Sequence, residues 1–125
     1  MKEENCLFCN LKNDKTIVLK QNKLFYAIYD TKPASLGHCL LIPKRHTMSF
    51  FNLMDEEVVD LYSLIKELKK LLETQFSIDG YNIGVNEGKA AGRTVEHLIL
   101  HIIPRHNGDV INPQGGIRNI LKYKG

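Results

Sequence analysis

The 125-residue chain has no tryptophan, only four prolines and no large excess of charge of one sign. Its 17 Lys and Arg residues against 14 Asp and Glu give a net charge of +3, and the basic residues are scattered, so we expect no nucleic-acid partner. No apolar run approaches the ~20 residues needed to cross a bilayer, so we expect no membrane partner. Residues 1–5 lack the apolar core of a secretory signal, and a cytoplasmic protein is therefore expected.

Cysteine is scarce as well. The chain has three cysteines, an odd number that argues against a disulfide framework and for a reducing compartment. Cys6 and Cys9 form a C-x-x-C pair, which is typical of a metal half-site or of a redox pair. The redox interpretation needs a βαβ context, and no strand pattern precedes the pair, so the metal interpretation is favoured. Cys39 lies in an apolar run and is expected to be a small buried hydrophobe.

The remaining composition, 43% apolar and 25% charged, is that of an ordinary globular protein, and the length suits a single domain over residues 1–125. Apolar residues at spacings of three and four predict one long amphipathic helix that begins at the acidic cluster 55–57 and ends before residue 79. Short β-branched and aromatic runs predict strands over 16–19, 24–29, 38–42, 81–85 and 94–103. The predicted class is α+β with a mainly antiparallel sheet, followed by a mostly irregular tail.

Two histidines, His97 and His101, fall on one face of the last predicted strand, because alternate strand residues share a face. A glycine-rich loop precedes them. Either both imidazoles address one bound ligand, or they are satisfied core or interface histidines.

The segment from Gly92 to Arg105, GRTVEHLILHIIPR, resembles the signature of the histidine triad (HIT) family, H-φ-H-φ-H-φ-φ with φ apolar. Other parts of the chain that resemble the family pattern are CLFC at 6–9, the strand 25–30, GHCLLIPKRH at 37–46, the loop 86–94 and the tail 108–118. The resemblance covers essentially the whole chain. It implies the HIT fold, in which two chains join their sheets in a homodimer.

The chain departs from the family pattern at the middle triad position, where the nucleophilic histidine corresponds to Ile99. The resemblance implies nucleotidyl transfer to that histidine and hydrolysis, acting on nucleoside phosphoramidates or dinucleoside polyphosphates and releasing a nucleoside monophosphate. Isoleucine has no lone pair and cannot carry this intermediate, so we expect impaired catalysis. The histidine was lost naturally or replaced deliberately. One alternative is a non-catalytic nucleotide-binding module. Another is a purely structural protein, which would not need the intact phosphate loop that this chain has.

By the same resemblance the ligand is a purine nucleotide or a dinucleoside polyphosphate, and Asp30 accepts hydrogen bonds from the ribose hydroxyls. The implied phosphate contacts are Asn86, Gly92, Thr94 and His101, of which His101 is also assigned to catalysis. The family usually has glutamine where this chain has Arg93, so a charged contact is added to the phosphate loop. The positions that match the base pocket are Leu7, Phe8, Leu11 and Ile28, which would equally pass as core residues.

A structural zinc ion is also implied by the resemblance. Its ligands would be Cys6, Cys9, His46 and His97. This set offers the nitrogen and sulfur donors that zinc prefers in a tetrahedral site, with all four positions filled by protein. The alternative is a pair of reduced cysteines without metal.

Overall fold

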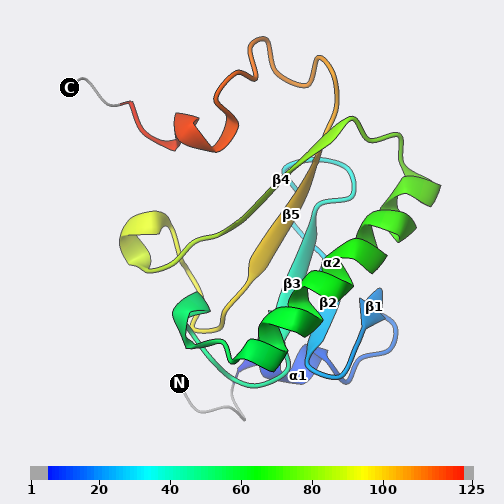
Figure 1. Ribbon diagram of the computed structural model, residues 1–125, viewed down its shortest axis with the longest axis vertical. Coiled ribbons are helices and arrows are strands. Elements are labelled where there is room, and N and C mark those ends of the chain that lie inside the picture. The colour runs from blue at the N-terminus through cyan, green and yellow to red at the C-terminus, as the bar shows by residue number, and fades with distance from the viewer. Residues whose placement is uncertain (1–5, 123–125) are drawn as a thin grey trace.

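The computed structural model describes residues 6–122, which form a five-stranded antiparallel sheet with helices on both faces (Figure 1). The strand order is β1-β2-β3-β5-β4. The strands are β1 (Lys20–Gln21), β2 (Phe25–Tyr29), β3 (Cys39–Pro43), β4 (Gly80–Val85) and β5 (Leu100–Arg105). The helices are α1 (Leu7–Leu11) and α2 (Asp55–Gln75), with short 3-10 helices η2 (Phe50–Asn52), η3 (Lys89–Ala91) and η4 (Gly116–Ile120). The predicted α+β class and antiparallel sheet are confirmed.

Helix α2 packs across one face of the sheet, where Figure 1 shows it in green. It begins at Asp55, as predicted, with three acidic residues in its first turn, where carboxylates interact favourably with the helix dipole. The Glu57 carboxylate accepts a hydrogen bond from the backbone N–H of Met54 at 2.9 Å. The buried core between helix and sheet consists of Leu61, Leu64, Leu68, Leu72, Phe25, Ala27, Cys39, Leu41, Leu100 and Ile102.

The other face of the sheet is covered in part by α1. Strands β2 and β3 are buried on both faces, which explains why their sequences are almost continuously apolar. The second cluster consists of Tyr26, Ile28, Leu40 and Ile42, with Phe8, Leu11, Val18 and Ile99 packed against it. Because successive strand residues alternate between faces, Leu100 faces α2, whereas Ile99 and His101 lie on the side of α1.

The start of the last strand was predicted wrongly. The strand was expected over 94–103, but β5 begins only at Leu100. In the preceding segment the backbone N–H of Leu98 donates to the carbonyl of Thr47 at 2.7 Å instead of joining a ladder. Residues 94–99 therefore form an irregular connection that leads into the sheet.

The strand predicted over 16–19 is also wrong. The Asp14 carboxylate accepts hydrogen bonds from the backbone N–H and the hydroxyl of Thr16, which stabilises a turn in place of extended backbone. The short strand β1 lies just after this turn. The tail beyond Arg105 is largely irregular, as predicted, apart from η4. Among residues 6–122, no helix has the length and apolar character that a membrane span requires.

Candidate functional site

One cavity of about 310 Å³ opens on the side of the sheet that carries α1. Its apolar end is formed by α1 and strand β2, and its polar end by the loop 86–94. All the residues assigned to the nucleotide or to catalysis line this cavity: Leu7, Phe8, Leu11, Ile28, Asp30, Asn86, Gly92, Arg93, Thr94, Ile99 and His101. The fold thus gathers residues that are far apart in sequence around one space. Their contacts with a nucleotide stay a prediction.

The polar wall of the cavity is a loop whose shape depends on two glycines. Gly88 has φ +87° and Gly92 has φ +102°, in the left-handed region that other residues rarely adopt. The Gly92 N–H donates to the carbonyl of Lys89 at 2.9 Å, and the Arg93 N–H donates to the carbonyl of Gly88 at 3.1 Å. These bonds close a tight turn that holds the side chain of Arg93 beside the cavity.

A hydrogen-bonded chain of side chains lies at the base of the cleft. The Nδ1 atom of His38 accepts a hydrogen bond from the Ala34 N–H at 2.9 Å, so the proton of the neutral ring is on Nε2. This Nε2 lies 3.0 Å from His101 Nδ1 and 3.4 Å from an oxygen of Asp30. His38 therefore donates to His101, whose own proton must be on Nε2. The His101 ring thus offers one N–H donor beyond the chain.

Burial favours the neutral form of both cleft histidines. Burial lowers the pKa of His38, and the Asp30 carboxylate opposes this effect. Burial also lowers the pKa of His101, and the Asp30 carboxylate again acts in the opposite direction. The neutral state is the one that the directional hydrogen bonds between the rings require.

The ligand atoms of Asp30, His38 and His101 lie within 4.8 Å of one another, yet the set does not fit a metal. Ligation through His38 Nε2 would move its proton to Nδ1, which faces the Ala34 N–H. Two donors would then oppose each other. His38 itself was not among the predicted site residues, although the block 37–46 that resembles the family contains it.

A second cluster contains Cys6, Cys9, His46 and His97, whose ligand atoms also lie within 4.8 Å of one another. The distance from Sγ to Nδ1 is 3.3 Å for Cys6 and His97, 3.1 Å for Cys9 and His46, and 3.4 Å for Cys9 and His97. Ideal tetrahedral zinc, with bonds of about 2.3 Å to sulfur and about 2.0 Å to nitrogen, places such atoms about 3.5 Å apart. The donor types and their spacing both fit a zinc ion.

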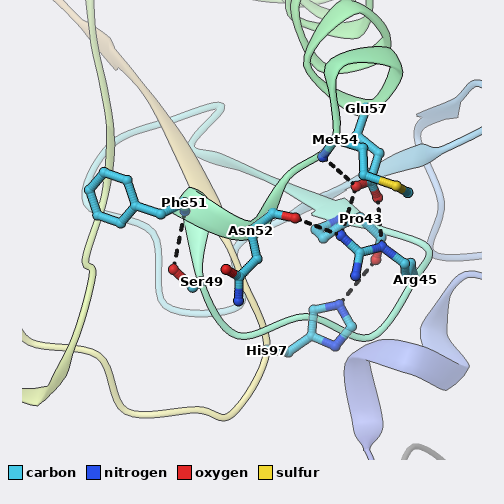
Figure 2. Close-up of polar contacts among 8 residues, drawn as sticks. All are labelled: Pro43, Arg45, Ser49, Phe51, Asn52, Met54, Glu57 and His97. Carbon is cyan, nitrogen blue, oxygen red and sulfur yellow. Dashed lines mark hydrogen bonds and ion pairs between the residues drawn. The ribbon is translucent and has the colours of Figure 1, made fainter.

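The orientation of His97 is fixed from the other side of its ring (Figure 2). Its Nε2 lies 3.0 Å from the carbonyl oxygen of Pro43, to which it donates. This bond leaves Nδ1, the atom beside both cysteine sulfurs, without a proton and therefore able to bind a metal. His97 is 1% exposed, so solvent does not compete for either nitrogen.

An ion pair between Arg45 and the buried Glu57 anchors the segment that leads to His46 (Figure 2). The neighbouring Arg45 donates to both carboxylate oxygens of Glu57 on α2, at 2.8 and 3.2 Å, and to the carbonyl of Asn52 at 2.9 Å. Glu57 is 1% exposed, and its hydrogen bonds with Arg45 lower its pKa. The long helix thus holds the connection after β3 in place.

The structure separates the two histidines that the sequence placed on one strand face. His97 precedes β5 and belongs to the Cys2His2 cluster, whereas His101 belongs to the chain with His38. They line the same cavity but do not share one set of partners. Cys39 is fully buried as predicted, and burial raises the pKa of its thiol to about 12, so it stays protonated.

Comparison with known proteins places the chain in a family. The model of the HIT domain matches residues 11–108, about four-fifths of the sequence. The chain belongs to the HIT family. It is 38% identical over 108 residues to an uncharacterised HIT-like protein of Methanocaldococcus jannaschii, covering 83% of this chain and 81% of that protein.

Two relatives from Schizosaccharomyces pombe have named activities. One is an adenosine 5'-monophosphoramidase, 36% identical, with 82% of this chain and 76% of that protein covered. The other is an asymmetrical bis(5'-nucleosyl)-tetraphosphatase, 37% identical, with 74% of this chain but only 50% of that protein covered. Among solved structures, a zinc-bound histidine triad family protein from Mycobacterium smegmatis matches with a TM-score of 0.76 and 32% identity, covering 89% and 82% of the two chains. The predicted HIT fold is confirmed.

Proposed function

We propose that this HIT protein binds a purine nucleotide or a dinucleoside polyphosphate in its cavity, and that its site is of the nucleotidyl hydrolase or transferase type with impaired catalysis. The observation that carries the proposal is the gathering of all the assigned nucleotide residues around one cavity that also contains Ile99. The phosphoramidase and tetraphosphatase among its relatives support the substrate class.

In this proposal each part of the cavity meets one part of the ligand. The Asp30 carboxylate, oriented by a 2.8 Å hydrogen bond from the Lys32 N–H, accepts the ribose hydroxyls. The Asn86 amide, the Thr94 hydroxyl and the His101 N–H donate to phosphate oxygens. The base lies between the apolar side chains Leu7, Phe8, Leu11 and Ile28.

Ile99 leaves this site without a nucleophile. Its side chain packs against the apolar cluster on the cleft face of β2 and β3, a setting that accommodates a β-branched residue. Neither neighbouring histidine replaces the lost group: His97 has its ring nitrogens beside Pro43 and the cysteines, and His101 Nδ1 accepts from His38. Nucleotide binding without efficient turnover follows.

The test is Ile99→His, assayed on a fluorogenic nucleoside phosphoramidate and on a diadenosine polyphosphate. We expect turnover to rise by at least about a hundredfold, or about 2.7 kcal/mol of barrier, because the donors around the phosphate are already in place. Ile99→Gln is the matched control, since it adds a polar group of similar length without an imidazole, and it should show no gain.

The outcomes separate the two candidate functions. A gain with Ile99→His alone supports an intact site that lacks one group. If turnover does not rise but nucleotide binding is retained, the non-catalytic binding module is favoured. The hydrogen bond between His38 and His101 is compatible with this alternative too. Substantial and equal activity in the original chain and both variants would contradict the triad mechanism.

We also propose that the Cys2His2 cluster holds a structural zinc ion, that residues 1–125 form one domain, and that two chains form a homodimer. A reducing, cytoplasmic setting would keep both thiols available to zinc. Strand β4 lies at the edge of the sheet, with Ile83 42% exposed, and an edge strand of this kind is able to pair with a second copy. Light scattering at micromolar concentration should give twice the chain mass; a monomer would contradict the dimer.

A further inference from the structure

Arg93 is the feature of the cavity that the proposed function leaves unexplained. Its side chain is half-buried and lines the cavity, between Gly92 and Thr94 of the phosphate loop. Within residues 6–122 the guanidinium has no hydrogen bond or ion pair with another side chain, and only the backbone N–H is engaged, with Gly88. A half-buried cation without a protein counter-charge is suited to an anionic ligand.

The charged side chains around the cavity show which group is available to an anionic ligand. Among the described residues that line it, Arg93 and Asp30 are the side chains with a formal charge at pH 7. Burial lowers the pKa of His101, and His97 belongs to the Cys2His2 cluster. The Asp30 carboxylate is already directed at His38 and at the Lys32 N–H. Arg93 is therefore the fixed positive charge that remains for a ligand.

The other phosphate-facing groups are uncharged. An amide, a hydroxyl and a neutral imidazole N–H suit the first phosphate of a nucleotide, whose charge is modest. A guanidinium adds a planar pair of donors and a full charge, which matches further phosphate oxygens in a polyphosphate chain. A glutamine, as the family usually has here, offers neither the charge nor the fork.

We propose that Arg93 makes this cavity selective for nucleotides that carry more than one phosphate, as nucleoside diphosphates and dinucleoside polyphosphates do, over monophosphates and phosphoramidates. This inference rests on the proposed function and specifies its substrate class. The guanidinium acts on the phosphates beyond the first, while Asn86, Thr94 and His101 hold the first one.

The experiment is calorimetric titration of the intact protein with adenosine, adenosine monophosphate, adenosine diphosphate and diadenosine tetraphosphate. We expect the diphosphate and the tetraphosphate to bind more tightly than the monophosphate. Arg93→Gln should weaken binding of these two ligands about tenfold and of the monophosphate less than about threefold, so the preference largely disappears. Raising the salt concentration should reduce the same preference in the original chain.

Two variants serve as controls. Lys89→Gln removes a positive charge from the same loop, at an exposed side chain that does not line the cavity, and should leave the preference unchanged. Arg93→Lys keeps the charge without the planar fork and should retain part of the preference. Retained binding of the monophosphate shows that each variant is folded.

The possible failures are distinguishable. If the preference for the diphosphate survives Arg93→Gln, or if binding of monophosphate and diphosphate weakens equally, the inference is overturned while nucleotide binding stands. If Lys89→Gln abolishes the preference as fully as Arg93→Gln, general loop charge is responsible, and the inference is again overturned. If the original chain binds none of the four ligands at millimolar concentration, the proposed function fails together with the inference.

Discussion

Two histidine clusters on the same side of the sheet have similar dimensions and different chemistry. In each, the ligand atoms lie within 4.8 Å of one another. In the Cys2His2 cluster, His97 uses Nε2 to donate to a carbonyl and so presents a bare Nδ1. In the cleft, His38 uses Nδ1 to accept from an N–H and so presents a protonated Nε2. The partner on the far side of each ring thus decides whether it suits a metal or a hydrogen-bonded chain.

The same comparison explains where Ile99 lies. In the sequence Ile99 lies between His97 and His101. His97 belongs to the Cys2His2 cluster, called the closed cluster below, and His101 belongs to the cleft. The four candidate metal ligands of the closed cluster lie together, and the cleft contains its hydrogen-bonded chain. Under the proposed function, isoleucine at this position impairs catalysis, while both clusters are assembled.

The largest expected effect comes from breaking the closed cluster with Cys9→Ser. Zinc content should fall from about one ion per chain to below about 0.2, because a hydroxyl is a poor zinc ligand. The melting temperature should fall by about 10 °C or more, since the binding energy of a structural metal is folding energy. Elemental analysis and thermal unfolding measure the two effects.

Cys39→Ala is the matched control for this variant, because Cys39 is a buried cysteine outside the cluster. It should lose some packing energy and keep its zinc. An original chain that lacks zinc after purification without chelators, or a Cys9→Ser variant that keeps it, would contradict the metal assignment.

A smaller effect is expected from Asp30→Asn, which changes the cleft and spares the closed cluster. Affinity for adenosine monophosphate should fall about tenfold, because a neutral amide is a weaker acceptor for the ribose hydroxyls. Affinity for 2',3'-dideoxyadenosine monophosphate should be equal in the two proteins, and zinc content should not change. Equal loss for both nucleotides would show that Asp30 does not recognise the ribose.

The smallest expected effect concerns pH. Burial lowers the pKa of His101 in the folded chain, so below about pH 6.5 the unfolded chain binds a proton that the folded chain does not. The free energy of unfolding should therefore decrease as pH falls from about 6.5 toward the lowered pKa. In His101→Gln this decrease should be smaller, as measured by urea unfolding of both proteins at matched pH with zinc present. An unchanged or steeper decrease in the variant would show that His101 makes no such contribution.

The order of residues alone predicts the fold class and the long helix, whereas the residues around the cavity were predicted from the resemblance to the HIT family. Helix α2 follows from apolar residues at helical spacing behind the acidic start at Asp55, and β2 and β3 follow from apolar runs that end at turns. These are local patterns, which a chain carries in its order of residues. The proposed assignment of Ile99 to the middle triad position also rests on the order of residues.

Local patterns do not show which groups meet: the Cys2His2 set was predicted only from the resemblance, and the hydrogen bond between His38 and His101 and the protonation states follow from the tertiary structure. Cys6 lies 91 positions before His97, and His38 lies 63 positions before His101, yet each pair is in contact. The late start of β5 likewise depends on the distant carbonyl of Thr47. Periodicity encodes which face a residue takes, but the partner of each polar atom comes from a remote part of the chain. That partner decides whether an imidazole can bind a metal or donate a proton. The lack of a side-chain partner among residues 6–122 is what makes the Arg93 guanidinium the group that we propose for further phosphates.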